Sequence, residues 1–570
     1  MNQKLLRKKL ALMLANLRKK RPYYCEVEYL EADGTQYIDT GDIQAGIGLK
    51  VDTVAEKTSS ATSEMAIIGR SSGGGFELYA YNNRIGLWNT AGANSIDVNT
   101  SMTQNEKFHF IGEVKNNSLS LSINGSETTK TAITAEGTDP LTATITLFRH
   151  NGRYNFIGKI YYCKIWSNNT LVCDLIPVLD WNYVPCMYDK VTGQLLYNAG
   201  TGDFTYGREI HYVEYLEGTG TQHIDVPYIP KDTSGLRAVW CYSDEGDRVI
   251  AGARWSTMSS GRWFIGHYSS GLYFGWNSLV ATIVTTADTF YDCKLNMYND
   301  RKVYLDGVEQ ATISTTLDTT SMAAMKLFFV DHAGAKAIGK LKLCQVTEGD
   351  KLIYDFVPAI DENGVGFMFD KVTHTCFLNV GTGAFKYPAR QLVYLKSTGT
   401  EYIDTGTKFD CANTTIEVKT NETSLTQVHS ICGNDGNVFY LFRGTGNWAV
   451  GYNATDFNIQ DYVVLGDNTF KIDKNLVYVN GDLVKTYTAS TTLSTSNTLI
   501  FNRKTSLVDS GPVTIYYCKI WNNNEVVRYL IPCFKDGVAG MLDKANNVFY
   551  SNVGSGTFTV GKIVEPKYER

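Results

Sequence analysis

The sequence lacks the long apolar run that a membrane-spanning helix requires, because no stretch reaches about 18 apolar residues. Proline is sparse, at 11 residues in 570, and charged residues make up only 19%. This composition excludes disordered and fibrous proteins. What the chain does contain is 36 Tyr, 25 Phe and 51 Gly. Aromatic residues suit pleated, half-buried strands, so the composition favours a β-rich globular protein.

Cysteine pairs are also lacking. The 12 cysteines include no CxxC pair and no spacing typical of a metal site. One cysteine position recurs along the chain, at Cys163, Cys344 and Cys518, and a single cysteine per repeat cannot pair within its own domain. We therefore expect buried free thiols and folding in a reducing cytosol.

Outside the first residues of the chain, acidic residues outnumber basic ones. The net charge is −5, yet residues 1–21 hold eight basic groups and no acidic group. Taking these eight positive charges away from −5 leaves −13 for the rest. Phosphate binding needs a basic face, so we expect no nucleic acid as a partner.

A secretion signal of the usual form is missing too. The apolar stretch 10–15 is short, and the basic residues 18–21 stand where a small-residue cleavage site would lie. Conventional secretion is therefore not expected.

Residues 1–22 instead predict a basic amphipathic helix. Leu6, Leu10, Met13 and Leu17 fall at i, i+4, i+7 and i+11, which is one face of a helix. We interpret this face as a docking surface for another protein of an assembly. A solvated basic tail and a helix on a membrane surface are the alternatives, and a membrane is the less favoured partner.

A long repeat organises the remaining chain. The stretch that begins YLEADGTQYIDTG at Tyr29 returns at Tyr215 as YLEGTGTQHIDVP and at Tyr394 as YLKSTGTEYIDTG. Each copy also closes alike, with an Asp-Lys pair followed by a Gly-x-Gly turn. Copies of this length are whole duplicated domains rather than solenoid units. The predicted organisation is helix 1–22, domains 23–207, 208–389 and 390–562, and a tail 563–570.

Within each copy, short strands alternate with turn signals. Residues 76–89 predict a hairpin with Asn82 and Asn83 at its tip, and residues 108–123 predict two further strands. No strong amphipathic helix interrupts them. The predicted fold class is all-β, with three tandem antiparallel β-sandwiches of the jelly-roll type.

The strand that runs from Gly158 to Trp166, Gly-x-Ile-x-x-x-x-Ile-Trp, follows an Asn-Gly hairpin in the first copy. In this it resembles the concanavalin A-like lectin/glucanase superfamily, in its laminin-G-like branch. The opening motif resembles repeats found in proteins of gut bacteria and their phages. The resemblance covers about residues 23–562 and implies a lectin-like sandwich. It does not define a function, because one fold hosts lectins, glycosidases and structural modules.

No catalytic motif is present. Glycosidases of this superfamily carry Glu-x-Asp-x-x-Glu on one strand, and glycoside hydrolysis needs two carboxylates about 5–10 Å apart. The nearest pattern here, Glu31 and Asp33, is not repeated in the sister copies. We therefore expect a protein that is not an enzyme.

A set of aromatic and amide residues recurs where a sugar platform could lie. A ring that stacks on the apolar face of a sugar, beside amide or charged hydrogen-bonding groups, is typical of lectin sites. The alternative is a half-buried core aromatic followed by a turn Asn. The predicted glycan-binding residues are Trp88, Asn89, Arg70, Trp276, Asn277, Arg254, Tyr452, Asn453 and Asn434.

Two further positions recur along the repeats. Trp166 and Trp521 are expected in the core, with Val346 in their place in the middle copy. Asp39, Asp225 and Asp404 recur at one position, and laminin-G-like domains often hold calcium. A lone Asp near a turn is usually local turn chemistry, so no metal ligand and no cofactor is assigned.

The sequence thus predicts a non-enzymatic phage virion protein, as a fibre, tail-tip or head-decoration subunit. It would be made in the host cytoplasm, join other virion proteins through residues 1–22 and bind cell-surface or mucosal glycans. A bacterial surface or secreted adhesin is the alternative, and a glycoside hydrolase is the second. Assembly of identical copies is left open.

Overall fold

The computed structural model describes residues 21–566 apart from 42–47, 71–75, 90–93, 132–143, 244–245, 247, 255–260, 269–270, 330–335, 435–437, 445–446 and 505–510. The predicted helix 1–22, with Leu6, Leu10, Met13 and Leu17, lies almost entirely outside the described residues. The described elements are strands β1 to β50 and two 3-10 turns, η1 (Met297–Asn299) and η2 (Gln460–Tyr462). The all-β prediction is therefore confirmed. In these ranges no helix is long and apolar enough to cross a membrane.

Each repeat consists of a smaller and a larger antiparallel sheet. In the first repeat the smaller sheet has the order β3-β12-β5-β6-β7-β8, formed by Ile38–Asp39, Ile145–Leu147, Met65–Arg70, Phe76–Tyr81, Arg84–Asn89 and Asn94–Val98. The larger sheet has the order β11-β10-β9-β4-β13-β14-β15-β16, formed by Ser126–Thr131, Ser118–Ile123, Lys107–Lys115, Leu49–Lys57, Gly158–Ser167, Thr170–Leu179, Pro185–Asp189 and Gln194–Leu196. Strand β2 (Leu30–Ala32) pairs with β13 and with β17 (Thr205–Tyr206).

The second repeat has the same plan. Its smaller sheet has the order β20-β29-β22-β23-β24-β25, formed by Ile224–Asp225, Lys326–Leu327, Arg248–Arg254, Arg262–Tyr268, Gly271–Trp276 and Ser278–Ile283. Its larger sheet has the order β28-β27-β26-β21-β30-β31-β32-β33, formed by Val308–Thr312, Lys302–Leu305, Tyr291–Leu295, Ser234–Tyr242, Ile338–Glu348, Lys351–Ile360, Gly366–Asp370 and Thr375–Leu378. Strand β19 (Leu216–Thr219) pairs with β30.

The third repeat follows the same order again. Its smaller sheet is β36-β45-β38-β39-β40-β41, formed by Ile403–Asp410, Leu493–Ile500, His429–Gly433, Phe439–Arg443, Trp448–Tyr452 and Thr455–Asn458. Its larger sheet is β44-β43-β42-β37-β46-β47-β48-β49, formed by Asp482–Thr486, Leu476–Val479, Gly466–Asp473, Thr414–Glu422, Val513–Asn522, Glu525–Lys535, Val538–Asp543 and Val548–Ser551. Strands β34 (Arg390–Gln391), β35 (Leu395–Ser397) and β50 (Thr559–Val560) complete it.

Alternating side chains of the two sheets form the core between them. In β9 every second residue is buried, and Phe110 packs in one apolar cluster with Leu78 and Leu87 of the smaller sheet. This period of two is the one a sandwich requires. The predicted hairpin 76–89 is present as β6 and β7, and Asn82 takes the left-handed φ of 50° that a tight turn needs.

The recurring cysteines lie in this core. Cys163, Cys344 and Cys518 are fully buried in β13, β30 and β46, and all twelve cysteines are free thiols. The expectation for Trp166 and Trp521 was wrong, because both rings are half-buried and the core position beside them belongs to Ile165 and Ile520.

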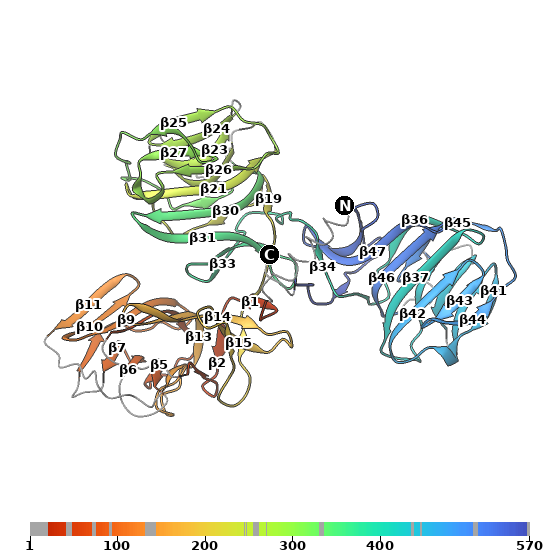
Figure 1. Cartoon of the computed structure of the whole chain (residues 1–570), viewed down its shortest axis with the longest axis horizontal. Helices are drawn as coiled ribbons and strands as arrows, with labels where there is room; N and C mark the ends of the chain where they lie inside the picture. Colours follow the sequence, from red (N-terminus) through yellow and green to blue (C-terminus); the bar gives the residue numbers. More distant parts are fainter. Residues whose placement is uncertain are drawn as a thin grey trace, which may run out of the picture.

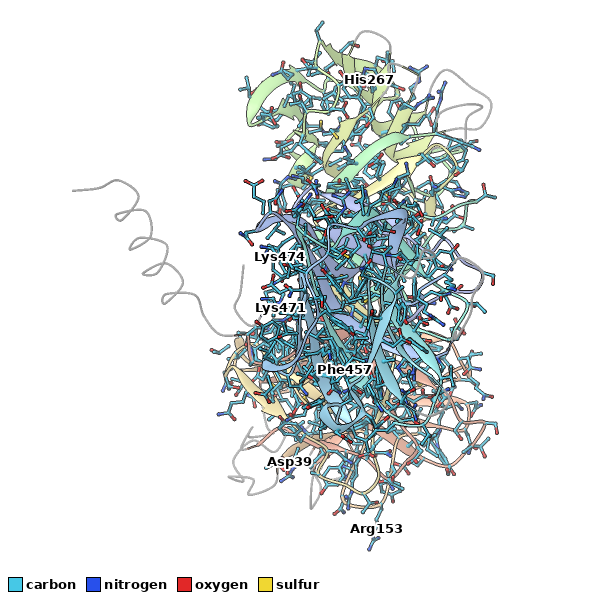
Figure 2. The ribbon with its side chains drawn as sticks, turned by 90° about the vertical axis from the view of Figure 1, so that its right-hand side faces the viewer. Asp39, Arg153, His267, Phe457, Lys471 and Lys474 are labelled. Carbon is cyan, nitrogen blue, oxygen red and sulfur yellow. The ribbon has the colours of Figure 1, made fainter. Side chains whose placement is uncertain are left out.

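Strand β18 (Glu209–Tyr212) joins the first two repeats. It pairs with β1 (Cys25–Val27) of the first repeat and with β31 of the second, so their larger sheets form one continuous hydrogen-bonded sheet. The three sandwiches lie around a common centre, the first in red and orange, the second in green and the third in blue (Figure 1). Seen from the side, Asp39 of the first repeat and His267 of the second lie toward opposite ends, while Phe457 of the third repeat lies between them (Figure 2).

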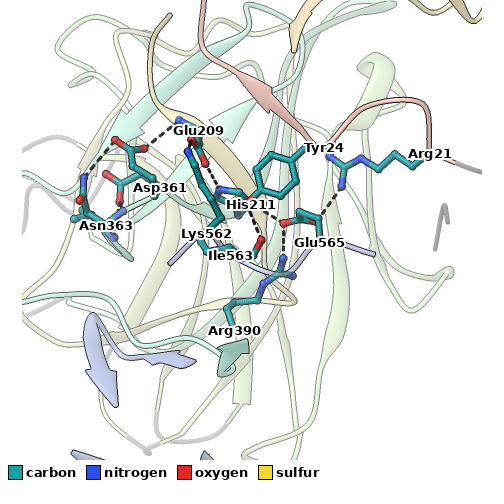
Figure 3. A network of polar contacts seen from close by, with 12 residues as sticks. Arg21, Tyr24, Glu209, His211, Asp361, Asn363, Arg390, Lys562, Ile563 and Glu565 are labelled. Carbon is teal, nitrogen blue, oxygen red and sulfur yellow. Dashed lines mark hydrogen bonds and ion pairs between the residues drawn. The ribbon is translucent and has the colours of Figure 1, made fainter. Parts of the chain in front are cut away.

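All three repeats meet at Glu565, in the segment that was expected to be a tail (Figure 3). Its carboxylate accepts hydrogen bonds from Arg21 at 2.9 Å and Arg390 at 2.5 Å, and it lies 2.8 Å from His211 Nδ1. Only 5% of the Glu565 side chain is exposed. Arg21 leads into the first repeat, His211 lies in β18, and Arg390 lies in β34 of the third repeat. The expectation of a C-terminal tail is therefore corrected for its described residues, 563–566.

Further contacts close this junction. Tyr24 donates a 2.6 Å hydrogen bond to the carbonyl oxygen of Ile563, and Lys562 donates one to Glu209. His211 Nε2 also lies 3.0 Å from Glu209. Both ring nitrogens of His211 thus face carboxylates, and this buried ion-pair network holds the three repeats to one another.

Candidate functional site

A cavity of about 340 Å³ opens on the outer face of the smaller sheet of the first repeat. Strands β6 and β7 form its floor, and Glu77 of β6 is paired across the sheet with Trp88 of β7. The loop that follows β12 forms one wall. The lining residues are Glu64, Glu77, Tyr79, Trp88, Ser95, His150, Asn151 and Tyr154.

Two glycines make room for the cavity walls. A Cβ on Gly69 would lie 2.5 Å from Cβ of His150, so only glycine lets the loop come this close to β5. A Cβ on Gly86 would lie 2.3 Å from the ring of Tyr79, which is its cross-strand partner. The sequence therefore places Tyr79 flat over the sheet and His150 against its edge.

Backbone hydrogen bonds fix the loop at residues 148–154. The amide of Phe148 donates to Ile67 at 2.9 Å, and the amide of Asn151 donates to Arg70 at 2.6 Å. Asn151 and Gly152 both adopt positive φ, which turns the chain back toward the sheet. Arg153, at the tip of this loop, lies at the end of the first repeat that points away from the other two (Figure 2).

Glu77 is the most unusual group of the cavity. Its side chain is 3% exposed, and among the described residues Oε1 has no hydrogen-bond partner. Burial raises the pKa of Glu77 to about 8, and the charge of Glu64 adds to this effect. The carboxyl is therefore mostly protonated at neutral pH, and it offers a proton donor and an acceptor to the cavity.

His150 beside it is neutral. The backbone N–H of Arg70 donates to His150 Nδ1 at 3.1 Å, which assigns the ring proton to Nε2. Nε2 lies 3.8 Å from Glu77 Oε2, beyond hydrogen-bond distance. Burial lowers the pKa of His150 to about 4, and the charge of Arg70 adds to this effect. The imidazole thus supplies an N–H donor and no charge.

The open side of the cavity carries acidic and hydroxyl groups. Tyr79 donates a 2.7 Å hydrogen bond to Asp97, and Ser95 donates a 3.3 Å hydrogen bond to the other oxygen of that carboxylate. Arg84 lies 3.9 Å from Asp97. Burial raises the pKa of Glu64 modestly above its usual value. The aromatic rings and the polar groups therefore share one small space.

The three aromatic residues that were predicted to bind glycans differ in their burial. Trp88 is half-buried and lines the cavity, whereas Trp276 and Tyr452 are 0% and 1% exposed. Trp276 faces Trp263 across the sheet, and Tyr452 faces Phe439, so both rings point into the closed core. The interpretation of Trp276 and Tyr452 as sugar platforms is thus corrected.

A shift of one residue explains the difference. Trp276 and Tyr452 come directly after the outward-facing Gly275 and Gly451, whereas Trp88 comes two residues after Gly86. Successive residues of a strand point to opposite faces, so the extra residue turns Trp88 outward.

The predicted polar partners take mainly structural roles. Asn89 is 2% exposed and lies opposite Phe76 on the core side of the sheet. Asn277, with φ 60°, donates to the carbonyl oxygen of Thr316, and Asn453, with φ 48°, begins the turn after β40. These two asparagines are turn residues, as the alternative interpretation held.

The residues that precede each hairpin are not grouped on an open face. Arg70 is 3% exposed and touches the cavity wall through its backbone contact with His150. Arg254 ends β22 and is half-buried. Asn434 is fully buried and accepts the backbone N–H of Val438 at 3.1 Å.

Sequence reasoning missed Glu77, Glu64, His150 and Tyr154. Glu77 occupies an outward position of a strand, where a glutamate is ordinarily solvated. Only the covering loop, far away in the sequence, buries it. The one available signal was the recurring glycine of the smaller sheet, Gly86, which marks a close approach of a side chain.

Asp39 and Asp404 accept the backbone N–H groups of Gly41 and Gly406, which is local turn chemistry. The ligand atoms of Cys25, Glu209 and His211 lie within 4.8 Å of one another. Because both His211 nitrogens already face carboxylates, this group is better described as part of the ion-pair network than as a metal centre.

No family model matches the chain, and no curated protein matches it. Similar solved structures include a candidate carbohydrate-binding protein from Bacteroides ovatus, at 12% identity and TM-score 0.25, over 32% of this chain and 60% of that protein. They also include the LG1-3 region of the laminin alpha2 chain, at 9% identity and TM-score 0.27, over 95% of this chain and 100% of that one. Domains LG4-5 of the mouse laminin alpha1 chain match at 9% identity and TM-score 0.24, over 58% of this chain and 92% of that one.

Proposed function

We propose that the chain is a carbohydrate-binding protein that carries out no reaction, and that it binds glycans in the cavity of the first repeat. The observation that carries this proposal is the arrangement of Trp88, Tyr79 and Tyr154 around the buried carboxyl of Glu77. Sugars present an apolar face and a ring of hydroxyl groups. An aromatic wall beside convergent polar groups is the surface that matches both.

The size and position of the cavity indicate how the glycan binds. A volume of about 340 Å³ lies at the small end of ligand sites, which suits a terminal sugar better than a long internal segment. The loop around Arg153 lies at the far end of the first repeat (Figure 2). A glycan on a cell or mucosal surface would reach this end without meeting the other repeats.

We further propose a place in a phage virion, as a fibre, tail-tip or head-decoration subunit. Residues 1–22 would dock on another virion protein through Leu6, Leu10, Met13 and Leu17, with the three sandwiches projecting outward. The basic amphipathic pattern of residues 1–22 and the free thiols support this placement. A bacterial surface adhesin is the alternative.

The binding proposal is tested with the full chain on a glycan array and on intact bacterial cells. Trp88→Ala should remove most of the bound signal. The matched control is Trp166→Ala, which removes a half-buried Trp from the larger sheet of the same repeat. No bound glycan, or an equal loss in both variants, would refute the proposal.

The virion placement is tested by deleting residues 1–20, which leaves Arg21 and its bond to Glu565 in place. The truncated protein should fold normally and fail to join the particle. Finding the native protein in the envelope of uninfected cells would favour the adhesin alternative.

A second candidate function is glycoside hydrolysis. It is favoured by one observation, namely that the cavity holds two glutamates, and burial raises the pKa of Glu77 to about 8. Two carboxyl groups in different environments can act as acid and base in glycoside hydrolysis. Release of reducing ends from host polysaccharides, abolished by Glu77→Gln, would establish this function in place of simple binding.

A further inference from the structure

The described lining of the cavity of the first repeat contains carboxyl groups and no cationic side chain. Glu64, Glu77 and Asp97 face it or border it, and Arg84 lies beside Asp97. His150, the basic side chain of the lining, is neutral because burial and the charge of Arg70 lower its pKa to about 4. An anionic ligand would meet these carboxyl groups and no free positive charge among the described lining residues.

An ammonium group would bind the buried carboxyl of Glu77 more strongly than a sugar hydroxyl group would, because the contact is charge-assisted. Oε1 of Glu77 is buried beside the cavity and has no described hydrogen-bond partner. A buried acceptor without a partner costs free energy, and a cation that donates to it recovers that cost and adds a charge-assisted hydrogen bond.

The walls of the cavity also suit a cation. Trp88 and His150 stand edge to face with ring centres 6.0 Å apart, and Tyr154 lies nearly parallel to His150 at 6.1 Å. Aromatic faces attract ammonium groups through their negative π surface, and Trp does so best. An aromatic wall and a buried carboxyl on one floor form a site for an ammonium group that sits on an apolar framework.

We propose that the cavity selects a sugar that carries a free, positively charged amine, such as a de-acetylated amino sugar. This inference rests on the proposed function and names its ligand class. The ammonium group donates to Glu77, the carboxyl of Glu64 offers a second acceptor, and the sugar ring lies against Trp88. An N-acetylated sugar has no charge to place there, and its added acetyl group must fit into a small cavity.

Binding of such a ligand has a measurable consequence. At pH 6.5 the free protein holds a proton on Glu77, because the pKa of this carboxyl is raised to about 8. An ammonium group beside Glu77 favours the carboxylate, so binding expels that proton into the buffer. The other charged groups nearest to Glu77 are Glu64, Arg70, Arg84 and Asp97. Loss of the proton release in Glu77→Gln assigns the released proton to Glu77.

The test is calorimetric titration of the full chain with glucosamine, N-acetylglucosamine and glucose at pH 6.5, in two buffers of different ionisation enthalpy. We expect glucosamine to bind about tenfold more tightly than the two neutral sugars, which corresponds to one charge-assisted contact. Its apparent enthalpy should shift between buffers by an amount equal to nearly one released proton. The neutral sugars should show no such shift. This readout needs no variant, so it holds even if a substitution disturbs folding.

Glu77→Gln then identifies the group. The substitution keeps the shape of a protonated carboxyl, and it should abolish both the preference for glucosamine and the proton release. Glu106→Gln, at an exposed position of the same repeat, is the matched control and should change neither. Circular dichroism and thermal unfolding verify that both variants fold.

The outcomes separate this inference from the proposed function. Equal binding of the three sugars without proton release overturns the amine preference and leaves carbohydrate binding standing. Binding of choline or a simple alkyl diamine, with no binding of any sugar, supports an ammonium site and overturns the carbohydrate function. No binding of any of these probes overturns both.

Discussion

Arg21 and Glu565 form an ion pair of 2.9 Å although 544 positions separate them in the chain. The same carboxylate also bonds to Arg390 and lies 2.8 Å from His211, so one side chain near the C-terminus contacts the first residues of all three repeats. Burial favours the neutral form of Glu565, but His211, Arg390 and Arg21 outweigh this and hold its pKa below the usual value. A buried charge network thus joins the three repeats, so they are not independent domains.

Removing this carboxylate should loosen the array. Glu565→Ala leaves Arg21, Arg390 and His211 with buried charge and no shared acceptor, which typically costs about 3–5 kcal/mol. We expect a lower free energy of unfolding and a larger radius of gyration in small-angle scattering. Glu525→Ala, at an exposed position of the third repeat, should change neither. Identical scattering of the two variants would show that the junction does not depend on Glu565.

The network should also depend on pH. Burial alone would lower the pKa of His211, but its hydrogen bonds to Glu209 and Glu565, and their charges, raise it above 6.5. The same interactions lower the pKa values of Glu209 and Glu565 below 4.5. A raised histidine pKa gives stability that is complete below pH 6.5 and is lost as pH rises through the folded value. Lowered glutamate pKa values give stability that is present above pH 4.5 and is lost as pH falls through theirs.

The stabilisation by His211 should therefore be greatest between about pH 4.5 and pH 6.5. The measurement is the difference in free energy of unfolding between the native chain and His211→Gln, taken across pH 4 to 9. Taking the difference removes the opposite contributions of His150, His374 and Glu77, whose pKa values burial shifts the other way. A difference that stays constant from pH 6 to pH 9 would contradict the raised pKa.

The cysteines should be unreactive in the folded protein. All twelve are free and all except Cys376 are buried, and burial raises the pKa of thiols such as Cys163 well above its usual value. The thiolate is the reactive form, so a thiol reagent at pH 8 should modify almost no cysteine in the native chain. After unfolding without a reducing agent, twelve thiols should titrate. A lower number would reveal disulfides in the native protein.

Much of the fold could be predicted because it depends on local signals that occur three times. The alternation of buried and exposed residues defines strands such as β9, and Asn82 at a two-residue turn defines the hairpin of β6 and β7. The junction could not be predicted from the same signals. Glu565 and Arg390 look like ordinary surface charges in the sequence, and only the mutual packing of the repeats buries them.

The site could be predicted only in part for a related reason. The pattern of aromatic plus Asn correctly drew attention to Trp88, but the same pattern at Trp276 and Tyr452 faces the core. By sequence similarity, Trp88 aligns with Trp276 and Tyr452, but its position in the strand differs from theirs by one residue. Neighbouring residues of a strand point to opposite faces of the sheet, so a shift of one residue changes the face. Glu77 and His150 carried no signal of their own, because a loop distant in the sequence creates their burial.

Because Trp276 points into the core and Trp88 points outward, their substitution by Ala should have opposite effects on stability and on glycan binding. Trp276 is fully buried and its indole N–H donates a 2.9 Å hydrogen bond to the carbonyl oxygen of Thr315. Trp276→Ala should therefore lower the free energy of unfolding by about 3–5 kcal/mol, as large core truncations do. Trp88 is half-buried on an open face, so Trp88→Ala should cost about 1 kcal/mol of stability and reduce glycan binding about tenfold.

Tyr452→Phe is the smallest substitution that distinguishes a role of Tyr452 in the core from a role in glycan binding. It keeps the ring and removes only the hydroxyl, which donates to the carbonyl oxygen of Cys411 at 3.1 Å. The expected loss of stability is about 1 kcal/mol, with no change in glycan binding. Denaturant unfolding and titration with the same glycan, measured on one protein preparation, give both quantities. If Tyr452→Phe or a still-folded Trp276→Ala weakened binding as strongly as Trp88→Ala, then the core-facing rings would contribute to recognition and the one-residue shift would not explain the site.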